Sequence, residues 1–146
     1  EMALGRVLAA LSAADGPDGQ PLIRAAHDLS NGGLIQSLVD SALRFGIGGS
    51  FDIAQAAGIA GVDDFVMLLS ESQGRAMVAV AEESLPAVYA AAEAEGVQAA
   101  RIGTTGGDMV AITGGDVLTD SGNVNGWMAD ITELRDMQES ALRSRF

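Results

Sequence analysis

Apolar side chains recur at helical spacing in two stretches of the first third of the chain. Between Met2 and Ala14 the spacing predicts an amphipathic helix, which the glycine- and proline-containing segment from Asp15 to Pro21 ends. Between Leu34 and Arg44 the apolar positions again fall on one side of a helix, and Gly46 stands where a glycine commonly closes one. Both stretches are therefore predicted to be helices that bury one face.

Two further helices are predicted from the residues that begin them. Ser84 is the expected N-cap of the first, with Pro86 in its first turn and Gly96 as its terminator. Asp130 opens the second, and Glu133 completes the pattern of a capping box. In the first of these helices we expect four side chains to face inward, namely Leu85, Val88, Tyr89 and Ala92.

Short apolar runs bounded by glycine, proline or polar residues predict the strands. These runs are 22–27, 47–53, 75–81, 99–104 and 109–113, with a further extended segment at 117–118 and a polar loop at 119–126. The continuous run from Arg75 to Ala81 is typical of a strand covered on both faces. The segment from Gly103 to Asp108 lacks the spacing of a dinucleotide-binding loop and is expected to form a hairpin turn. Periodicity does not assign the stretch before Gly61 and leaves Asp63 to Leu69 either helical or extended, while Trp127 is expected at a helix entry.

Helices and strands alternate along the chain, so we expect an α/β (α+β) fold in which helices flank a small mixed β-sheet. A length of 146 residues suits a single domain spanning 1–146. A chain of this size buries roughly 68–70% of its unfolded surface. The apolar content of 48% and the mean hydropathy of +0.24 supply the side chains for such a core. Because the sequence begins at Glu1, we expect a fragment of a longer chain, with an N-terminal helix at 1–14.

The charge of the chain argues against several classes of function. Its eight basic residues are all arginine, and twenty carboxylates give a formal net charge of −12, which would repel nucleic acid and anionic membranes. Without lysine there is no P-loop or Schiff-base chemistry. Without cysteine, and with His27 as the one histidine, disulfides, thiolate zinc sites and two-histidine metal sites are excluded. No apolar run approaches the length of a membrane span, so we expect a soluble, cytoplasmic protein that binds neither nucleic acid nor membrane.

The first polar segment that can carry chemistry is His27-Asp28-Leu29-Ser30-Asn31-Gly32-Gly33, at the turn from a predicted strand into a predicted helix. Such a turn directs free backbone N–H groups and the positive helix end towards one point, which favours a phosphate or a carboxylate. Two glycines allow ligand oxygens to approach the main chain. Alternatively, Ser30 or Asn31 caps the helix, the glycines only permit a tight turn, and His27 is a hydrogen-bonded structural residue.

The second polar segment is Ser70-Glu71-Ser72-Gln73-Gly74-Arg75, immediately before the predicted buried strand. Arg75 is able to hold a phosphate through two hydrogen bonds, and Glu71 is able to bind Mg²⁺ or a ribose hydroxyl. The alternative is an ion pair between Glu71 and Arg75 that fastens the start of the strand.

Both segments resemble motifs of a known family. The segment from His27 to Leu34 resembles the His-Asp-(hydrophobic)-Ser-Asp-Gly-Gly-Leu motif of the aminoimidazole ribonucleotide synthase-related superfamily. The segment from Leu69 to Arg75 resembles the Phe-Ser-Glu-Ser-x-Gly-Arg motif of its phosphoribosylformylglycinamidine synthases. The resemblance spans residues 22–146 and implies the second of two C-terminal α/β domains in a synthase built from two tandem units. The chain departs from the family at Asn31, where the usual residue is Asp, and the lost charge argues against a metal ligand there.

The resemblance also implies a function for the parent protein. Phosphoribosylformylglycinamidine synthases convert formylglycinamide ribonucleotide and ammonia into formylglycinamidine ribonucleotide in purine biosynthesis, using ATP and Mg²⁺. A glutaminase subunit supplies the ammonia, and a small accessory subunit completes the complex. The family's catalytic histidine and main Mg²⁺ carboxylates belong to the N-terminal domains of the same polypeptide. The resemblance therefore implies that this chain alone is inactive, has no catalytic residue or metal site, and holds no cofactor tightly.

By the same resemblance, the two polar segments line the counterpart of the substrate pocket, at a degenerate nucleotide site of the parent protein. The residues expected to contact substrate or nucleotide phosphate are Asp28, Ser30, Asn31, Gly32, Gly33, Ser70, Glu71, Ser72, Gln73 and Arg75. The two segments are thus expected to meet at the mouth of a small sheet and to form half of a cleft, whose other half belongs to a neighbouring domain. We also expect an exposed apolar patch where that domain packs.

Two other functions remain open from the sequence. The domain is alternatively a non-catalytic interaction module whose polar segments are purely structural. It is alternatively part of another superfamily member, such as an aminoimidazole ribonucleotide synthase, a selenophosphate synthetase or a thiamine phosphate kinase. These enzymes have a segment similar to the first motif but typically lack Ser-Glu-Ser-Gln-Gly-Arg.

Overall fold

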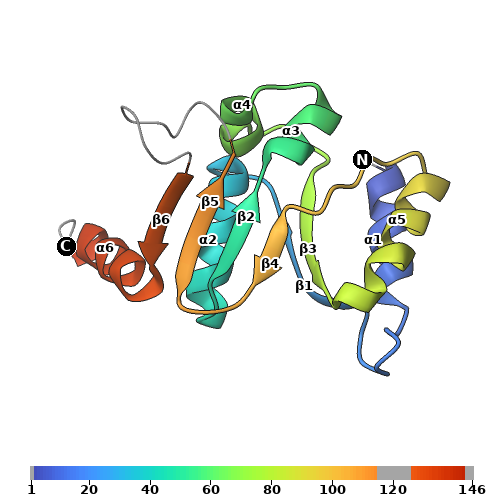
Figure 1. Cartoon of the computed structure of the whole chain (residues 1–146), viewed down its shortest axis with the longest axis horizontal. Helices are drawn as coiled ribbons and strands as arrows, with labels where there is room; N and C mark the ends of the chain where they lie inside the picture. The colour runs from blue at the N-terminus through green and yellow to red at the C-terminus, as the bar shows by residue number, and fades with distance from the viewer. Residues whose placement is uncertain (1, 115–125, 144–146) are drawn as a thin grey trace.

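A computed structural model describes residues 2–114 and 126–143 of the chain (Figure 1). Helices and strands alternate along it in a mixed α/β fold, as predicted. In chain order, the elements are α1 (Met2–Ser12), β1 (Ile23–Asp28), α2 (Gly33–Phe45), β2 (Gly49–Asp52), α3 (Ala54–Ala60), α4 (Asp64–Leu69), β3 (Ala76–Val80), the 3₁₀ turn η1 (Glu82–Ser84), α5 (Leu85–Ala94), β4 (Gly103–Thr105), β5 (Met109–Thr113), β6 (Gly126–Asp130) and α6 (Ile131–Arg143).

The described strands form two separate sheets where the sequence predicts one. The larger sheet has the strand order β4-β2-β5-β6, and it is mixed because β2 and β5 run parallel while both outer pairs are antiparallel. The smaller sheet is an antiparallel ribbon of β1 and β3. In Figure 1 the ribbon lies between the larger sheet and the paired helices α1 and α5, so it joins the two halves of the molecule.

The hairpin predicted from Gly103 to Asp108 is wrong. The strands β4 and β5 do not pair with each other, because β2 lies between them and pairs with both. The loop is held instead by the residue before β2, since Gly48 N donates to Gly107 O at 2.8 Å and Gly106 N donates to Gly48 O at 2.8 Å. The glycines do mark a turn between β4 and β5. The strand that separates these two strands in the sheet is β2, which precedes both in the sequence.

Two clusters of buried apolar side chains hold these elements together. The larger cluster lies between α2, α4 and the larger sheet, and its fully buried members are Ile53, Leu68, Val110 and Ile112. The smaller cluster joins α1 to α5, and its buried members are Val7, Leu11 and Leu22. The ribbon contributes to both, because Met77 packs against the larger cluster and Val80 packs against the smaller one.

Two helix ends confirm their predicted chemical signals. Gly46 ends α2 in the left-handed conformation, with φ of 65°, and donates its N–H to Ala42 O. Asp130 begins α6, where its carboxylate accepts the N–H groups of Thr132 at 2.6 Å and Glu133 at 3.3 Å. The residue that marks each boundary contacts groups within four residues of it, which is why the sequence predicts both.

Two predictions around β3 and α5 are wrong, and one is confirmed only in position. Ser84 is the N-cap residue of α5, after the turn η1, but its side chain makes no capping hydrogen bond, and its hydroxyl is buried without a hydrogen-bond partner in the described part of the chain. Tyr89 faces outward and is 41% exposed. Every residue of β3 is only half-buried, although its sequence is typical of a strand covered on both faces.

Segments that the sequence leaves open are assigned by the structure. The stretch 54–60 forms α3, and 64–69 forms α4, whose first turn is capped when Asp63 Oδ1 accepts the Val66 N–H at 2.8 Å. Trp127 lies in strand β6 and not at a helix entry. The predicted segment 117–118 and the loop up to residue 125 lie outside the described residues. None of the helices in the described ranges is long and apolar enough to cross a bilayer.

Candidate functional site

The two polar segments lie side by side because the strands that flank them are paired. Asp28, the last residue of β1, pairs with Ala76, the first residue of β3, and Leu29 N donates to Arg75 O at 3.2 Å. Further along, Gly32 N donates to Glu71 Oε1 at 2.7 Å. The segments therefore meet at one end of the ribbon, as the sequence predicts. We call the residues gathered there the polar corner: Asp28, Ser30, Asn31, Gly32, Gly33, Ser70, Glu71, Ser72, Gln73 and Arg75.

Helix α2 is capped by a residue of the other segment. Its N-cap is Gly32, in the left-handed conformation with φ of 76°, and it has no side chain with which to cap the helix. The Glu71 carboxylate takes that place, because it accepts the Gly32 N–H beside the positive end of the helix. The alternative in which Ser30 or Asn31 caps α2 is therefore wrong.

The second glycine lets two helices approach closely. Gly33 has φ of 68°, and a Cβ built on it would lie 2.5 Å from the carbonyl oxygen of Leu68 in α4. Ser37, one turn into α2, is buried, and its hydroxyl lies 3.1 Å from Asp28 O and 3.0 Å from Gly33 O. His27 Nδ1 lies 2.6 Å from Asp28 O, which agrees with the structural interpretation of that histidine. The burial of Ser37 could not be predicted, because a serine beside apolar positions carries no signal of burial.

Arg75 directs its guanidinium away from Glu71. The group donates to Ser70 O at 3.0 Å and to Met67 O at 2.9 Å, and it also lies 2.9 Å from Met67 Sδ. These carbonyl groups end α4, so the arginine closes the C-terminal end of that helix. Partial burial lowers the pKa of Arg75 through desolvation. The alternative of an ion pair between Glu71 and Arg75 is wrong, since the two residues make other contacts in the described structure.

The polar corner presents oxygen and amide groups to solvent but no free cation. Its exposed members are Asp28, Ser30, Asn31, Glu71, Ser72 and Gln73. Within residues 2–114 and 126–143, no group of three or more His, Cys, Asp or Glu side chains is placed to hold a metal ion. The hydroxyl and amide groups fit phosphate or ribose oxygens as hydrogen-bond partners. Arg75 is the one cation of the corner, and its guanidinium already donates to Met67 O and Ser70 O, so other cations are needed to balance the charge of a phosphate there.

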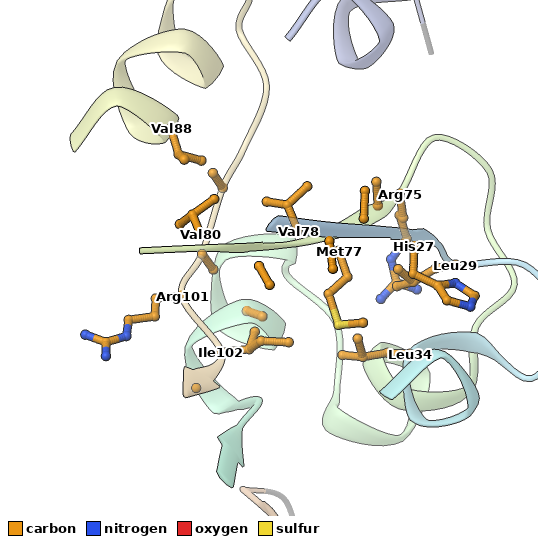
Figure 2. A pocket seen from close by; sticks show the side chains of 18 of the residues that line it. His27, Leu29, Leu34, Arg75, Met77, Val78, Val80, Val88, Arg101 and Ile102 are labelled. Carbon is orange, nitrogen blue, oxygen red and sulfur yellow. The ribbon is translucent and has the colours of Figure 1, made fainter. Parts of the chain in front are cut away.

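A cleft with a volume of ≈ 920 Å³ runs along the ribbon. It lies between α1 and α5 on one side and α2, β2 and β4 on the other, and its lining is largely apolar (Figure 2). In Figure 2, His27 and Arg75 lie at one end of the ribbon and Arg101 lies near the other. Of the polar corner, only Arg75 lines the cleft. The corner is thus an exposed surface beside the cleft and not its floor.

The comparison with known proteins identifies the same family that the two motifs indicate. The family model for AIR synthase related protein, C-terminal domain, matches residues 1–114. The phosphoribosylformylglycinamidine synthase subunit PurL of Thermobifida fusca is 37% identical over 146 residues, which is 100% of this chain and 16% of that protein. The subunit PurL of a Nocardioides species is 41% identical over 97 residues, which is 66% of this chain and 12% of that protein. The chain therefore spans less than a fifth of the length of these curated relatives.

Among solved structures, T. maritima PurL complexed with ATP is similar to this chain with a TM-score of 0.60, over 77% of this chain and 19% of that one. At 13% sequence identity this similarity shows a shared fold. The family model covers more than half of the chain and includes both segments of the polar corner. The chain therefore belongs to the family of AIR synthase related proteins, as a C-terminal domain of that family.

Proposed function

We propose that this chain is a C-terminal domain of a phosphoribosylformylglycinamidine synthase, and the second of two such domains in its polypeptide. That enzyme uses ATP to convert formylglycinamide ribonucleotide and ammonia into formylglycinamidine ribonucleotide in purine biosynthesis. The proposal is supported by the similarity to PurL subunits along the whole chain. It is also supported by the meeting of both family motifs in one polar corner.

In this proposal the polar corner forms one wall of a phosphate-holding cleft, and an N-terminal domain of the same polypeptide forms the other wall. The observation that carries it is the hydrogen bond from Gly32 N to Glu71 Oε1, which joins the two motifs into one surface. Asp28, whose Oδ1 lies 3.7 Å from His27 Nδ1, and the second oxygen of Glu71 are exposed and would face Mg²⁺ or its bound water. ATP with Mg²⁺ supplies the driving force for the reaction, and no residue of this chain has a catalytic role. The donors available to phosphate or ribose oxygens are Ser30, Asn31, Ser72 and Gln73.

Arg75 has a different role from the one that its motif implies. Its donors bind Met67 O and Ser70 O, so it positions the segment 70–75 without touching phosphate. Glu71 likewise accepts the N–H of Gly32, the N-cap residue of α2, so a phosphate does not bind directly at that N–H. Mg²⁺ and cations of the neighbouring domain balance the phosphate charge instead.

The partners follow from the same proposal. A glutaminase subunit supplies ammonia, and a small accessory subunit completes the complex in the cytoplasm. We expect the chain by itself to be inactive and to hold no nucleotide tightly, because the family's catalytic groups belong to the N-terminal domains.

The double substitution Asn31→Ala with Ser72→Ala tests the corner in the complete synthase. Both side chains are exposed and hold no other element in place, so the fold should be unaffected. We expect the KM for ATP or for formylglycinamide ribonucleotide to rise about tenfold, with a smaller change in kcat, because hydrogen bonds to a charged ligand are lost. Gln55→Ala, on the exposed side of α3, is the matched control. An unchanged KM together with unchanged nucleotide content would contradict the proposal.

A non-catalytic interaction module is the second candidate function. This function is favoured because Glu71 and Arg75 make hydrogen bonds within the chain, to Gly32 N and Ser70 O, and so have structural roles. The same double variant separates the two candidates. If it keeps its KM and nucleotide content while deletion of the whole domain abolishes assembly of the complex, the interaction module is supported.

A further inference from the structure

Asn31 and Gly32 form one of the two Asn–Gly pairs in the sequence, the other being Asn125–Gly126. Asparagine is chemically labile, because the backbone nitrogen of the next residue is able to attack its side-chain carbonyl carbon. A glycine in the next position leaves that nitrogen unhindered, since glycine has no side chain. Asn123, the third asparagine of the sequence, precedes a branched valine instead. The pair at 31–32 therefore places a reactive amide within the polar corner.

The structure presents Asn31 in an exposed turn. Gly33 N donates to Ser30 O at 3.3 Å, and Gly32 has φ of 76° and ψ of 3°, which are the angles of the third residue in a type II turn. Asn31 is the second residue of this turn and is exposed. Its side chain makes no hydrogen bond in the described part of the chain, so no contact there holds its amide group away from Gly32 N.

The reaction consumes water and needs no other reagent. Gly32 N gives its proton to the solvent and forms a bond to Asn31 Cγ. The bond from Cγ to the side-chain nitrogen then breaks, and ammonia leaves with a proton taken from the solvent, so that a five-membered succinimide ring remains. Water opens this ring at either carbonyl carbon. Cleavage between Cγ and Gly32 N gives aspartate at position 31, whereas cleavage between the main-chain carbonyl carbon and Gly32 N gives isoaspartate.

The Glu71 carboxylate opposes the first step of this reaction. Its Oε1 accepts the Gly32 N–H at 2.7 Å, so the proton that must leave is held in a charge-assisted hydrogen bond. The negative charge of the carboxylate also disfavours a second negative charge on the neighbouring nitrogen. Because both effects have the same sign, the attack on Asn31 is slowed as long as this hydrogen bond is formed.

We propose that Asn31 deamidates spontaneously and that Glu71 restrains the reaction in the folded chain. Aspartate at position 31 adds a negative charge near the Glu71 carboxylate, which contacts the next residue. Isoaspartate inserts an additional carbon atom into the main chain between residues 31 and 32, which displaces the N–H that Glu71 accepts. Both products alter the polar corner, so the hydrogen bond that joins its two segments also protects it chemically. This inference does not depend on the reaction proposed above.

Peptide mapping by mass spectrometry tests the proposal in the 146-residue chain. The chain is incubated under mildly alkaline conditions, folded and in urea, and conversion at Asn125 in the same samples is the reference for pH, temperature and time. In the folded chain, we expect Glu71→Ala to raise the rate at Asn31 about fivefold, because a hydrogen bond to an exposed charged group is lost. Glu71→Gln keeps an oxygen acceptor without the charge and should give an intermediate rate.

Two further variants separate this role of Glu71 from indirect effects. Glu93→Ala removes the same charge from the exposed side of α5 and should leave the rate at Asn31 unchanged. Gly46→Ala strains the opposite end of α2, where Gly46 has φ of 65°, and leaves the Glu71 contact in place. Its rate at Asn31, compared at the measured urea midpoint of each variant, shows how much lost stability alone contributes.

Three results would overturn the proposal. An intact Asn31 in every folded variant, at a time when the chain in urea is fully converted, would exclude the site. A rate at Asn31 that is equal or lower in Glu71→Ala would exclude the restraint, and a lower rate would show that the carboxylate acts as a base instead. Equal acceleration in Gly46→Ala and Glu71→Ala, at equal urea midpoints, would assign the protection to overall stability. None of these measurements reads synthase activity, so a failure of the proposed reaction leaves them interpretable.

Discussion

The guanidinium of Arg75 has a structural role, because its hydrogen bonds are made to backbone oxygens of the same chain. It donates to the last carbonyl oxygens of α4, while the backbone oxygen of the same residue accepts the N–H of Leu29 at the end of β1. One residue thus ties α4 to the ribbon and holds the segment that carries Glu71. Because Glu71 caps α2, the arrangement of the polar corner depends on an arginine that does not face it.

Arg75→Met keeps the aliphatic part of the side chain and removes its donors. We expect the free energy of unfolding to fall by about 2 kcal/mol, because Met67 O and Ser70 O lose hydrogen bonds to a charged group. Arg101→Met is the matched control, since its ion pair with Glu82 is exposed and is expected to contribute no more than about 0.5 kcal/mol. Urea unfolding measures both losses. Equal losses in the two variants would contradict the role assigned to Arg75.

Gly33→Ala should destabilise the chain more than Gly46→Ala, although both glycines have left-handed backbones, with φ of 68° and 65°. That conformation costs an alanine about 1–2 kcal/mol at either position. A Cβ at Gly46 meets nothing within 4 Å, whereas a Cβ at Gly33 would lie 2.5 Å from the Leu68 carbonyl oxygen. We therefore expect Gly33→Ala to cost about 2 kcal/mol more, as overpacking does. Similar urea midpoints for the two variants would mean that α2 and α4 separate easily.

At the scale of single elements, the start of α6 links stability to pH. The N–H of Thr132 is the largest cause that lowers the pKa of Asp130, followed by the Thr132 hydroxyl, with the Glu133 N–H adding to both. A carboxyl group whose pKa is lower in the folded than in the unfolded chain stabilises the fold above its ordinary pKa, here 3.8. That contribution disappears as the pH falls through the folded pKa. Acid should therefore loosen the first turn of α6.

Asp130→Asn tests this link, because asparagine also caps helices but does not titrate. We expect the unsubstituted chain to lose stability relative to the variant as the pH falls from about 6 to about 2. The measurement is the difference in urea midpoint at each pH, with the Thr132 amide shift as a local probe. A difference that stays constant over this range would show that the carboxylate charge at Asp130 does not stabilise α6.

Helices and strands marked by their own residues could be predicted from the sequence. Those that depend on contacts with residues distant in the sequence could not. The helices α1 and α2 carry an apolar stripe over three turns, and Asp130 marks the start of α6. By contrast, α3 is a seven-residue helix of small side chains with no clear stripe. The hairpin prediction at Gly103 failed because β2 enters between β4 and β5. Trp127 was misplaced because an aromatic residue before a helix is equally suited to a short edge strand.

The same division applies to the polar corner. Its two segments could be located from the sequence because glycine, hydroxyl and charged residues cluster in each of them. Their contacts could not be predicted, since Glu71 accepts the N–H of a residue 39 positions before it and Arg75 donates to a carbonyl oxygen eight residues before it. Only the pairing of β1 with β3 decides which of these groups meet.

At the scale of the whole molecule, two packed parts lie on either side of a two-stranded ribbon. The α1–α5 part has a buried cluster of three apolar residues in the described structure, and a two-stranded ribbon is marginally stable by itself. The ribbon is therefore stabilised mainly by what packs on its faces. The open cleft marks the place where this packing is incomplete within the chain.

The net charge of −12 makes the stability of the whole chain depend on salt. Like charges repel in the compact state, and added ions screen that repulsion, whereas exposed ion pairs such as Arg6–Glu95 contribute little that salt could remove. We expect the urea midpoint to rise when NaCl is raised from about 0.01 M to about 0.5 M, because the Debye length falls several-fold. The double variant Glu93→Gln with Asp136→Gln removes two exposed carboxylates from separate helices and should raise the midpoint at low salt while reducing its response to NaCl. A midpoint that falls with salt, or a variant with an undiminished response, would show that specific ion pairs outweigh the overall repulsion.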